Sequence, residues 1–134
     1  MSCTGQGQSL SDYLESQRWE HRMVITFDSS LNTKSVLEQQ QIRALFPEDW
    51  EDRDLFLLCL SHAGGVDQHD DAVSRELANA FFQYYSVRDG GFTVILVGKD
   101  GGEKLRREGQ ILDRTLLFET IDQMPMRQQE MREP

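Results

Sequence analysis

The sequence predicts a single α/β domain with a thioredoxin-like fold, in which a four-stranded mixed sheet carries helices on both faces. Three short segments are almost continuously apolar, which is typical of strands that are covered on both sides. They occupy residues 22–27, 54–60 and 92–97. Helical patterns separate these segments, and a more polar strand follows the third one. The expected order of elements is therefore β-α-β-α-β-β-α.

The first half of the chain predicts two helices and a loop around the first two strands. Residues 11–18 favour a short helix, and residues 32–46 favour a longer one that ends at Pro47, because proline interrupts a helix. Residues 47–54 are acidic and predict a surface loop. The side chains expected to face the core from the two helices are Tyr13, Leu14, Leu37, Ala44 and Leu45.

The second half predicts a loop, an amphipathic helix, a hairpin and a closing helix. Residues 61–70 are polar and favour a loop, whereas residues 71–87 repeat apolar side chains at helical spacing. The Asp-Gly turn within 99–102 is a hairpin signal, which makes residues 103–107 a returning edge strand. The closing helix is expected to begin near Asp113.

Strand pairing and domain limits follow from this order. Two parallel crossovers and one hairpin place the strand at 22–27 between those at 54–60 and 92–97, with residues 103–107 at the edge. We divide the chain into a flexible leader at 1–9, a thioredoxin-like domain at 10–124 and a polar, mobile C-terminal tail at 125–134.

Composition excludes two classes of partner. The chain has 134 residues with 14 basic and 23 acidic side chains, which is a formal net charge of -9. A field of that sign repels phosphate backbones and anionic lipids, so we expect no nucleic-acid partner. No apolar run reaches the length of a membrane span.

The two cysteines predict different environments. Cys59 lies inside the apolar run LFLLCL, where a thiol is buried and unreactive, although a redox role or a disulfide remains an alternative. Cys3 lies in the polar leader, and Ser2-Cys3 resembles the end of a bacterial lipoprotein signal. We therefore lean toward an extracytoplasmic location, with a cytoplasmic one as the alternative.

Three segments resemble a peroxiredoxin-like domain of unknown function, the P-DUDES family of short bacterial proteins, equarin and the sushi-repeat-containing proteins. These segments read RWEHRMVITF, VILVGKDGGEKLR and IDQMPMRQQEM. The resemblance spans about residues 10–131, and the pairing of GKDGG with MPMRQQEM is its most specific part. The resemblance implies a thioredoxin-like fold, in agreement with the order of elements, and implies no particular activity.

The position of the reactive thiol in thioredoxin-like enzymes holds no cysteine in this sequence. That thiol lies just after the central strand, where the start of a helix lowers its pKa. Here the position is filled by Asp28, Ser29, Ser30 and Leu31. The proline that such enzymes place before the third core strand is also missing, because residues 88–91 read RDGG. We therefore predict no catalytic residue of this kind.

Two interpretations remain for the hydroxyls at this position. Asp28, Ser29 or Ser30 can cap the following helix, which is the plainer interpretation. In the functional interpretation, Ser29, Ser30 and Thr33 hold a small anion or a polar ligand at the helix N-terminus. The charge of Asp28 argues against an anion, because that carboxylate already satisfies the helix dipole.

Two loops contain residue types that metals or phosphates use, but the spacing fits neither. His62, Asp67, His69, Asp70 and Asp71 crowd one loop without the pattern of a known metal site, so we predict a solvated loop and no metal or other cofactor. The GKDGG segment lacks the G-K-[ST] ending of a phosphate loop and favours a hairpin.

A basic cluster near the hairpin and the C-terminus is the remaining candidate site. Such a cluster on an acidic protein could receive a carboxylate, a sulfated glycan or an acidic partner. In the alternative, these charges protect a sheet edge from aggregation. The candidate residues are Arg22, Lys99, Lys104, Arg106 and Arg127, with Arg107 beside them.

Together these patterns predict a non-catalytic binding or interaction module whose partner is a protein or an anionic ligand. The alternative is a peroxiredoxin-like thiol oxidoreductase that uses Cys59 or the thiol of a partner. A third class, a hydrolase that uses Ser29 or Ser30, would react with a fluorophosphonate probe, and we expect no such reaction. Oligomeric state does not follow from these residues.

Overall fold

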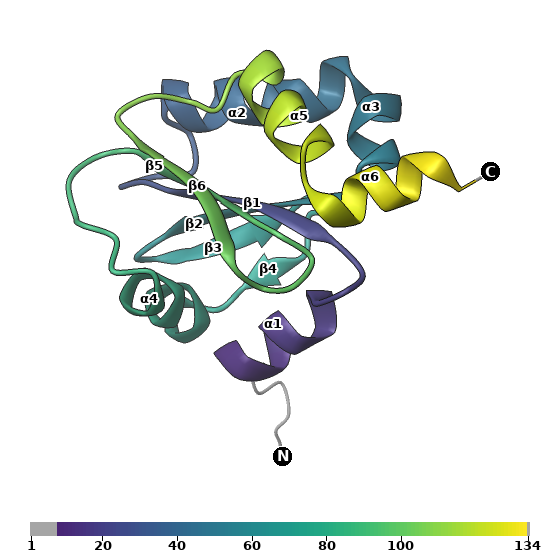
Figure 1. Ribbon diagram of the computed structural model, residues 1–134. Coiled ribbons are helices and arrows are strands. Elements are labelled where there is room, and N and C mark those ends of the chain that lie inside the picture. The colour runs from purple at the N-terminus through teal and green to yellow at the C-terminus, as the bar shows by residue number, and fades with distance from the viewer. Residues whose placement is uncertain (1–7, 134) are drawn as a thin grey trace.

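The computed structural model describes residues 8–133, which form one mixed sheet with helices on both faces (Figure 1). The sheet order is β4-β3-β2-β1-β5-β6. The strands are β1 (Arg22–Phe27), β2 (Leu55–Ser61), β3 (Gly64–Asp67), β4 (Ala72–Val73), β5 (Thr93–Val97) and β6 (Glu103–Glu108). The helices are α1 (Leu10–Gln17), α2 (Lys34–Leu45), α3 (Pro47–Asp52), α4 (Arg75–Tyr84), α5 (Arg114–Asp122) and α6 (Pro125–Arg132).

Strand β1 lies at the centre of the sheet, as the sequence predicts. It pairs in parallel with β2 and antiparallel with β5, and β5 pairs antiparallel with β6. The parallel pair is connected through α2 and α3, whereas the hairpin turns at Gly101, whose φ is +88°. Glycine adopts that conformation without steric cost, which explains the tight Asp-Gly turn.

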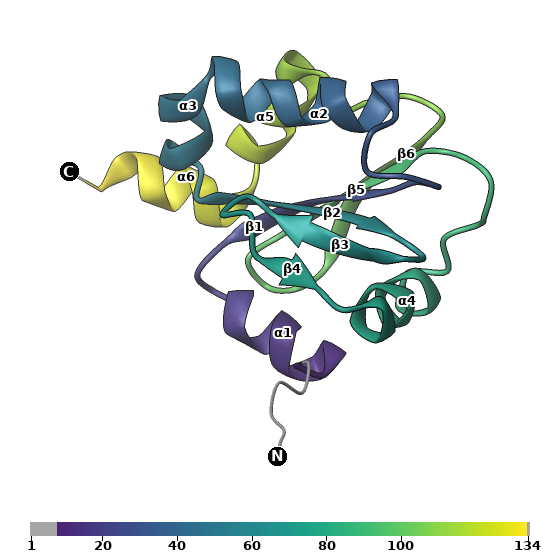
Figure 2. The same ribbon diagram turned by 180° about the vertical axis from the view of Figure 1, so that it is seen from behind.

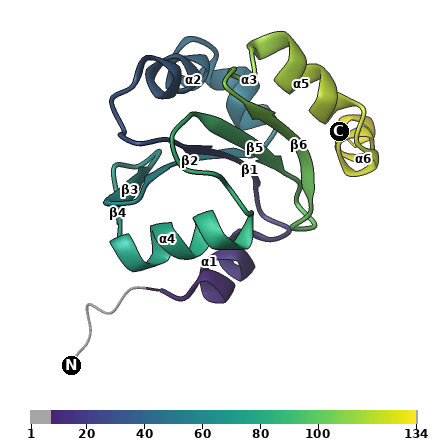
Figure 3. The same cartoon turned by 90° about the vertical axis from the view of Figure 1, so that its left-hand side faces the viewer.

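Two apolar layers hold the helices against the sheet, one on each face. Successive residues of β1 alternate between them, so that Val24 packs with α2, α3 and α5 while Ile25 packs with α1 and α4. Figure 3 shows α1 and α4 on one side of the sheet and α2 and α5 on the other. Because both faces are covered, all six residues of β1 are buried.

The sheet has six strands, so the prediction of four was too small. The additional strands β3 and β4 extend it beyond β2, where the sequence predicts a polar loop (Figure 2). A Cβ atom on Gly65 would lie 2.5 Å from the carbonyl oxygen of Cys59. Only glycine allows this close approach, so a segment that is polar in composition pairs with the free edge of β2.

The acidic segment after α2 is a helix, which corrects the predicted loop. Pro47 starts α3 as well as ending α2, because proline fits the first turn of a helix, where no backbone N–H is required. Trp50 lies on the inner side of α3 with 2 % of its surface exposed. Its Nε1 donates to Gln68 Oε1 at 3.1 Å, so a charged segment still covers the sheet.

The buried side of α2 also differs from the prediction. Leu37 and Leu45 are 46 % and 68 % exposed, whereas Val36, Gln39 and Ile42 are buried. Gln39 is tolerated in the core because its amide donates to the carbonyl of Leu112 and accepts the N–H of Leu112, both at 2.8 Å. Gln39 is therefore buried in the core, whereas Leu37, which hydrophobicity alone predicts there, is exposed.

Three predicted boundaries change in the structure. The fourth helix begins at Arg75 after Ser74 caps it, because residues 72–73 belong to β4. Within the predicted tail, Pro125 begins α6, on which Arg127 is 95 % buried. Within the predicted leader, Ser9 caps α1. The proposed division into leader, domain and tail otherwise stays a prediction.

Candidate functional site

The two ends of the sheet carry different polar groups. At the carboxyl end of β1, Asp28 is 92 % buried and binds two neighbours. One carboxylate oxygen accepts the N–H of Ser29 at 2.7 Å, and the other accepts the hydroxyl of Thr33 at 2.8 Å. The side-chain groups predicted at this position are thus held by hydrogen bonds within a six-residue loop.

The N-cap of α2 is Thr33, which corrects the prediction that residues 28–30 supply it. The Thr33 hydroxyl accepts the N–H of Val36 at 3.3 Å while it donates to Asp28. Ser30 instead accepts the N–H of Asn32 at 3.1 Å. Asp28 therefore orients the capping hydroxyl of Thr33 by accepting its hydrogen bond, and Ser30 stabilises the preceding turn.

Cys59 is a buried thiol, as the sequence predicts. It lies in β2 with 1 % of its surface exposed, and Gln40 Nε2 donates to its Sγ at 3.4 Å. Burial raises the pKa of the Cys59 thiol, and the neighbouring polar side chains of Thr26 and Gln40 offset this only in part. The neutral thiol is therefore favoured, which is the less reactive form. The predictions for Cys3 concern a residue outside the described part of the chain.

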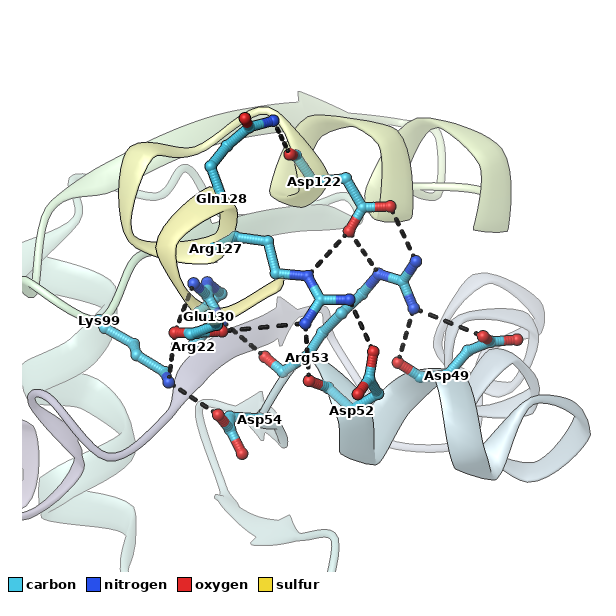
Figure 4. A network of polar contacts seen from close by, with 10 residues as sticks. All are labelled: Arg22, Asp49, Asp52, Arg53, Asp54, Lys99, Asp122, Arg127, Gln128 and Glu130. Carbon is cyan, nitrogen blue, oxygen red and sulfur yellow. Dashed lines mark hydrogen bonds and ion pairs between the residues drawn. The ribbon is translucent and has the colours of Figure 1, made fainter. Parts of the chain in front are cut away.

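The opposite end of the sheet carries a network of ion pairs (Figure 4). Arg22, at the start of β1, donates from both terminal nitrogens to Glu130 on α6, at 3.2 and 3.1 Å. Lys99, just after β5, donates to the same carboxylate at 2.8 Å and to Asp54 at 2.7 Å. One glutamate of α6 thereby joins two strands, while 1 % of the Arg22 side chain is exposed.

A second set of pairs joins α6 to α3 and α5. Arg127 donates to Asp52 at 2.6 Å and to Asp122 at 3.0 Å. Arg53 approaches the other oxygen of Asp122 at 2.8 Å and lies over the ring of Phe118. In Figure 4 the carboxylate of Asp122 lies between the two guanidinium groups. Through Arg127, the C-terminal helix is thus bound to the last residue of α3 and to α5.

The cations of this network change the pKa of its acids. Burial raises the pKa of Glu130, but the hydrogen bonds from Lys99 and Arg22 outweigh this and hold it below the usual value. For Asp122, too, burial raises the pKa, and the hydrogen bonds from Arg53 and Arg127 outweigh it. Both acids therefore remain ionised at neutral pH, and the network keeps its charges.

The predicted basic cluster is divided in the structure. Arg22, Lys99 and Arg127 belong to the network and already contact carboxylates. Arg106 pairs with Glu103 and donates to the carbonyl of Tyr85, so it takes no part in the network. Arg22, Lys99 and Lys104 line one cavity of about 440 Å³, together with residues of α5 and α6. The role of all these residues in ligand binding stays a prediction.

The loop rich in histidine and aspartate shows structural contacts. The Asp67 carboxylate accepts the N–H groups of His69 and Asp71, which shapes the turn between β3 and β4. His62 stacks on Phe82 and contacts Asn79 and, at 2.6 Å, Asp89. Within residues 8–133, no three side chains of the metal-binding kinds come together in a possible metal site.

The acids of the network are what the sequence interpretation missed. Glu130, Asp122 and Asp54 supply its central carboxylates, yet they are separated from their partners by up to 108 residues. A local signal was present for the helix that carries Glu130. Pro125 suits the first turn of a helix, and Arg127 and Glu130 are spaced as helical neighbours.

Comparisons with known sequences identify one family and a curated relative. The model of a family described as "Domain of unknown function (DUF4174)" matches residues 13–130. "Coiled-coil domain-containing protein 80" of Danio rerio is 25 % identical over 141 residues, an alignment that covers 92 % of this chain and 16 % of that protein. The chain therefore spans about a sixth of the length of this curated relative.

Two solved structures have a similar fold. A reduced 2-Cys peroxiredoxin from Plasmodium vivax matches with a TM-score of 0.60 and 11 % identity, covering 87 % of this chain and 84 % of that one. The mitochondrial 2-Cys peroxiredoxin of Plasmodium falciparum matches with a TM-score of 0.52 and 17 % identity, covering 85 % and 84 %. These similarities support a peroxiredoxin-like, thioredoxin-type fold. The narrower assignment to the P-DUDES family stays a prediction.

No helix in the described range, residues 8–133, is both long enough and apolar enough to cross a membrane.

Proposed function

The chain belongs to the DUF4174 family of domains of unknown function, and we propose that it is a non-catalytic binding module on a peroxiredoxin-like scaffold. One observation carries this proposal. After the central strand, where thioredoxin-like enzymes keep their reactive thiol, the side chains are Asp28, Ser29 and Ser30. The Asp28 carboxylate is occupied by the N–H of Ser29 and the hydroxyl of Thr33.

These groups cannot replace a peroxidatic thiol. A serine hydroxyl has no accessible anionic form near neutral pH. The base beside Ser29 is the Asp28 carboxylate at 3.5 Å, which already accepts two shorter hydrogen bonds. The neighbouring Asp28 uses both oxygens to hold the loop and lies 92 % buried. The loop therefore has the hydrogen bonds of a capped helix start, which supports the proposal of a non-catalytic module.

The alternative is a peroxiredoxin-like thiol oxidoreductase, for which the similarity to two peroxiredoxins supplies the fold and no further support. It would have to use Cys59 within the described range, because this is the only cysteine there. That thiol lies in the middle of the sheet, and burial raises its pKa. Peroxide would have to reach a side chain that is 99 % buried.

Peroxide consumption with a dithiol reductant tests the proposal. We expect the wild type to consume peroxide no faster than the Cys59→Ser variant. Rapid consumption by the wild type that is lost in Cys59→Ser would contradict the non-catalytic proposal. The variant Cys3→Ser is the matched control, since it removes the other cysteine of the sequence.

Alkylation of Cys59 provides an independent measurement. In the Cys3→Ser background, a maleimide should react slowly with the native protein and rapidly in denaturant, because the thiol is buried. We expect Cys59→Ser to lower the free energy of unfolding by about 1–3 kcal/mol, since it places a hydroxyl in an apolar layer. Fast alkylation of the folded protein would show that the thiol is accessible.

A further inference from the structure

A cavity of about 440 Å³ lies at the end of the sheet that carries the ion-pair network. Its size is in the range of small-molecule sites, which are about 300–1,000 Å³. The wall is built from the start of β1, the β5–β6 turn, β6, α5 and the start of α6. The lining residues are Arg22, Gly98, Lys99, Asp100, Lys104, Thr120, Gln123, Met124, Pro125 and Met126.

One side of this cavity is rich in hydrogen-bond donors with spare capacity. An ammonium group has three N–H donors, and among residues 8–133 Lys104 uses one of them, on Asp100 at 2.9 Å. Arg22 is 99 % buried, and its Nε has no partner within the described chain. Lys99 uses two of its three donors, on Asp54 and Glu130.

The charge of the lining is opposite to that of the protein. Three cations and one carboxylate line the cavity, in a chain whose formal net charge is -9. Asp100 is the one acid in the lining, and it is not buried, because 46 % of its side chain is exposed. The carboxylate of a ligand can therefore take its place beside Lys104 at a small cost.

The other side of the cavity is apolar. Met124, Pro125 and Met126 form the turn into α6, and Met126 is 39 % exposed. An exposed methionine beside a cavity offers a flexible apolar contact to a ligand body. Pro125 contributes no N–H, and no side chain caps α6, so this wall offers apolar contact without a competing carboxylate.

We infer that this cavity binds a small organic carboxylate with an apolar body, its carboxylate on Lys104 and its body against Met124 and Met126. The inference rests on the proposed function, because it names the class of ligand that the binding module takes. Charge attraction alone would also admit inorganic anions, but the methionine wall favours a ligand that buries apolar surface.

Titration with octanoate, followed by calorimetry and amide NMR shifts, tests this inference. We expect octanoate to bind with shifts at Gly98, Thr120 and Met126. Octanol, which lacks the charge, and acetate, which lacks the apolar body, should each bind at least tenfold more weakly. Equal binding of octanol and octanoate would overturn the carboxylate site, and so would the absence of octanoate binding at millimolar concentration.

Three variants make the test specific to Lys104. Lys104→Met should lower the affinity for octanoate at least tenfold, because it removes the ammonium group. Asp100→Asn should raise the affinity for octanoate several-fold, since it removes the competing charge. The asparagine keeps an acceptor for the N–H of Gly102, which the Asp100 carboxylate accepts at 2.9 Å. Lys34→Met, on the exposed surface of α2, is the matched control and should leave the affinity unchanged.

The outcomes separate this inference from the proposed function. If Lys104→Met binds octanoate as the wild type does, the site is wrong, whatever the peroxide assay shows. If the protein consumes peroxide through Cys59, the non-catalytic proposal fails, whatever the octanoate titration shows.

Discussion

The two ends of the sheet are stabilised in different ways. At the carboxyl end of β1, the Asp28 carboxylate binds Ser29 and Thr33, so its side-chain hydrogen bonds join residues no more than five positions apart. At the opposite end, Arg22 and Glu130 are 108 positions apart, and the bonded groups of Arg127 and Asp52 are 75 apart. The side-chain hydrogen bonds at one end lie within a single loop, whereas those at the other end join segments that are far apart in the sequence.

This difference separates local shape from tertiary stability. The loop at Asp28 forms its hydrogen bonds as soon as its own backbone turns, so losing one of them affects mainly the start of α2. The network at Glu130 exists only when strands β1 and β5 and helix α6 are all in place (Figure 4). Changes there should affect the stability of the whole fold.

The largest effect is expected for Glu130→Ala. The change leaves Arg22, which is 99 % buried, without a carboxylate, and an unpaired buried charge is costly. We expect the free energy of unfolding to fall by about 3 kcal/mol, measured by urea denaturation. Glu133→Ala, an exposed glutamate on the same segment, is the control and should change stability little. Equal effects of the two variants would contradict the central role of Glu130.

The pH dependence of stability sharpens the comparison. The pKa of Glu130 is below its usual value in the folded protein, so the unfolded chain binds a proton more readily. The stability that Glu130 contributes is therefore complete above its unfolded pKa, near 4.3, and is lost as the pH falls through its lower folded pKa. Asp122 contributes with the same sign.

Glu130→Gln isolates this contribution, because it removes the charge and keeps the shape. We expect the variant to be less stable than the wild type at pH 7 by about 1–2 kcal/mol, and the gap to close below about pH 4. Denaturation series at pH 7, 5, 4 and 3 measure it. A gap that stays constant over this range would show that the charge of Glu130 does not stabilise the fold.

Smaller effects are expected at the other end of the sheet, where the larger of two is that of Asp28→Ala. The change removes an acceptor from the N–H of Ser29 and from the hydroxyl of Thr33, while Thr33 still caps α2. We expect a loss of about 1 kcal/mol in thermal or urea unfolding. Ser30→Ala should change stability by less than about 0.5 kcal/mol. A loss at Asp28 as large as that at Glu130 would remove the contrast between the two ends.

Sequence patterns predicted the fold where a segment carries its own signal. The runs at β1, β2 and β5 are apolar enough to be recognised, and the Asp-Gly turn marks the β5–β6 hairpin. The interpretation failed at β3 and α3, where polar composition indicated loops. These segments are ordered by neighbours, since Gly65 approaches the backbone of β2 and Trp50 covers the sheet.

The candidate site shows the same division. Three of the cationic side chains named from the sequence, Arg22, Lys99 and Lys104, do lie together around one cavity. Their clustering was indicated because two of them lie in the β5–β6 hairpin and the third begins the central strand. Their partners were not indicated, because a carboxylate on α6 has no feature that distinguishes it from any exposed acid.

The sequence by itself determined the central strands, the hairpin and the absence of a cysteine after β1, because each depends on residues next to one another. Only the tertiary structure decided that the C-terminal segment is a docked helix and that Glu130 joins Arg22 to Lys99. The physical reason is distance along the chain. Burial and ion pairing between remote segments depend on which groups the folded backbone brings together, and no local pattern records that.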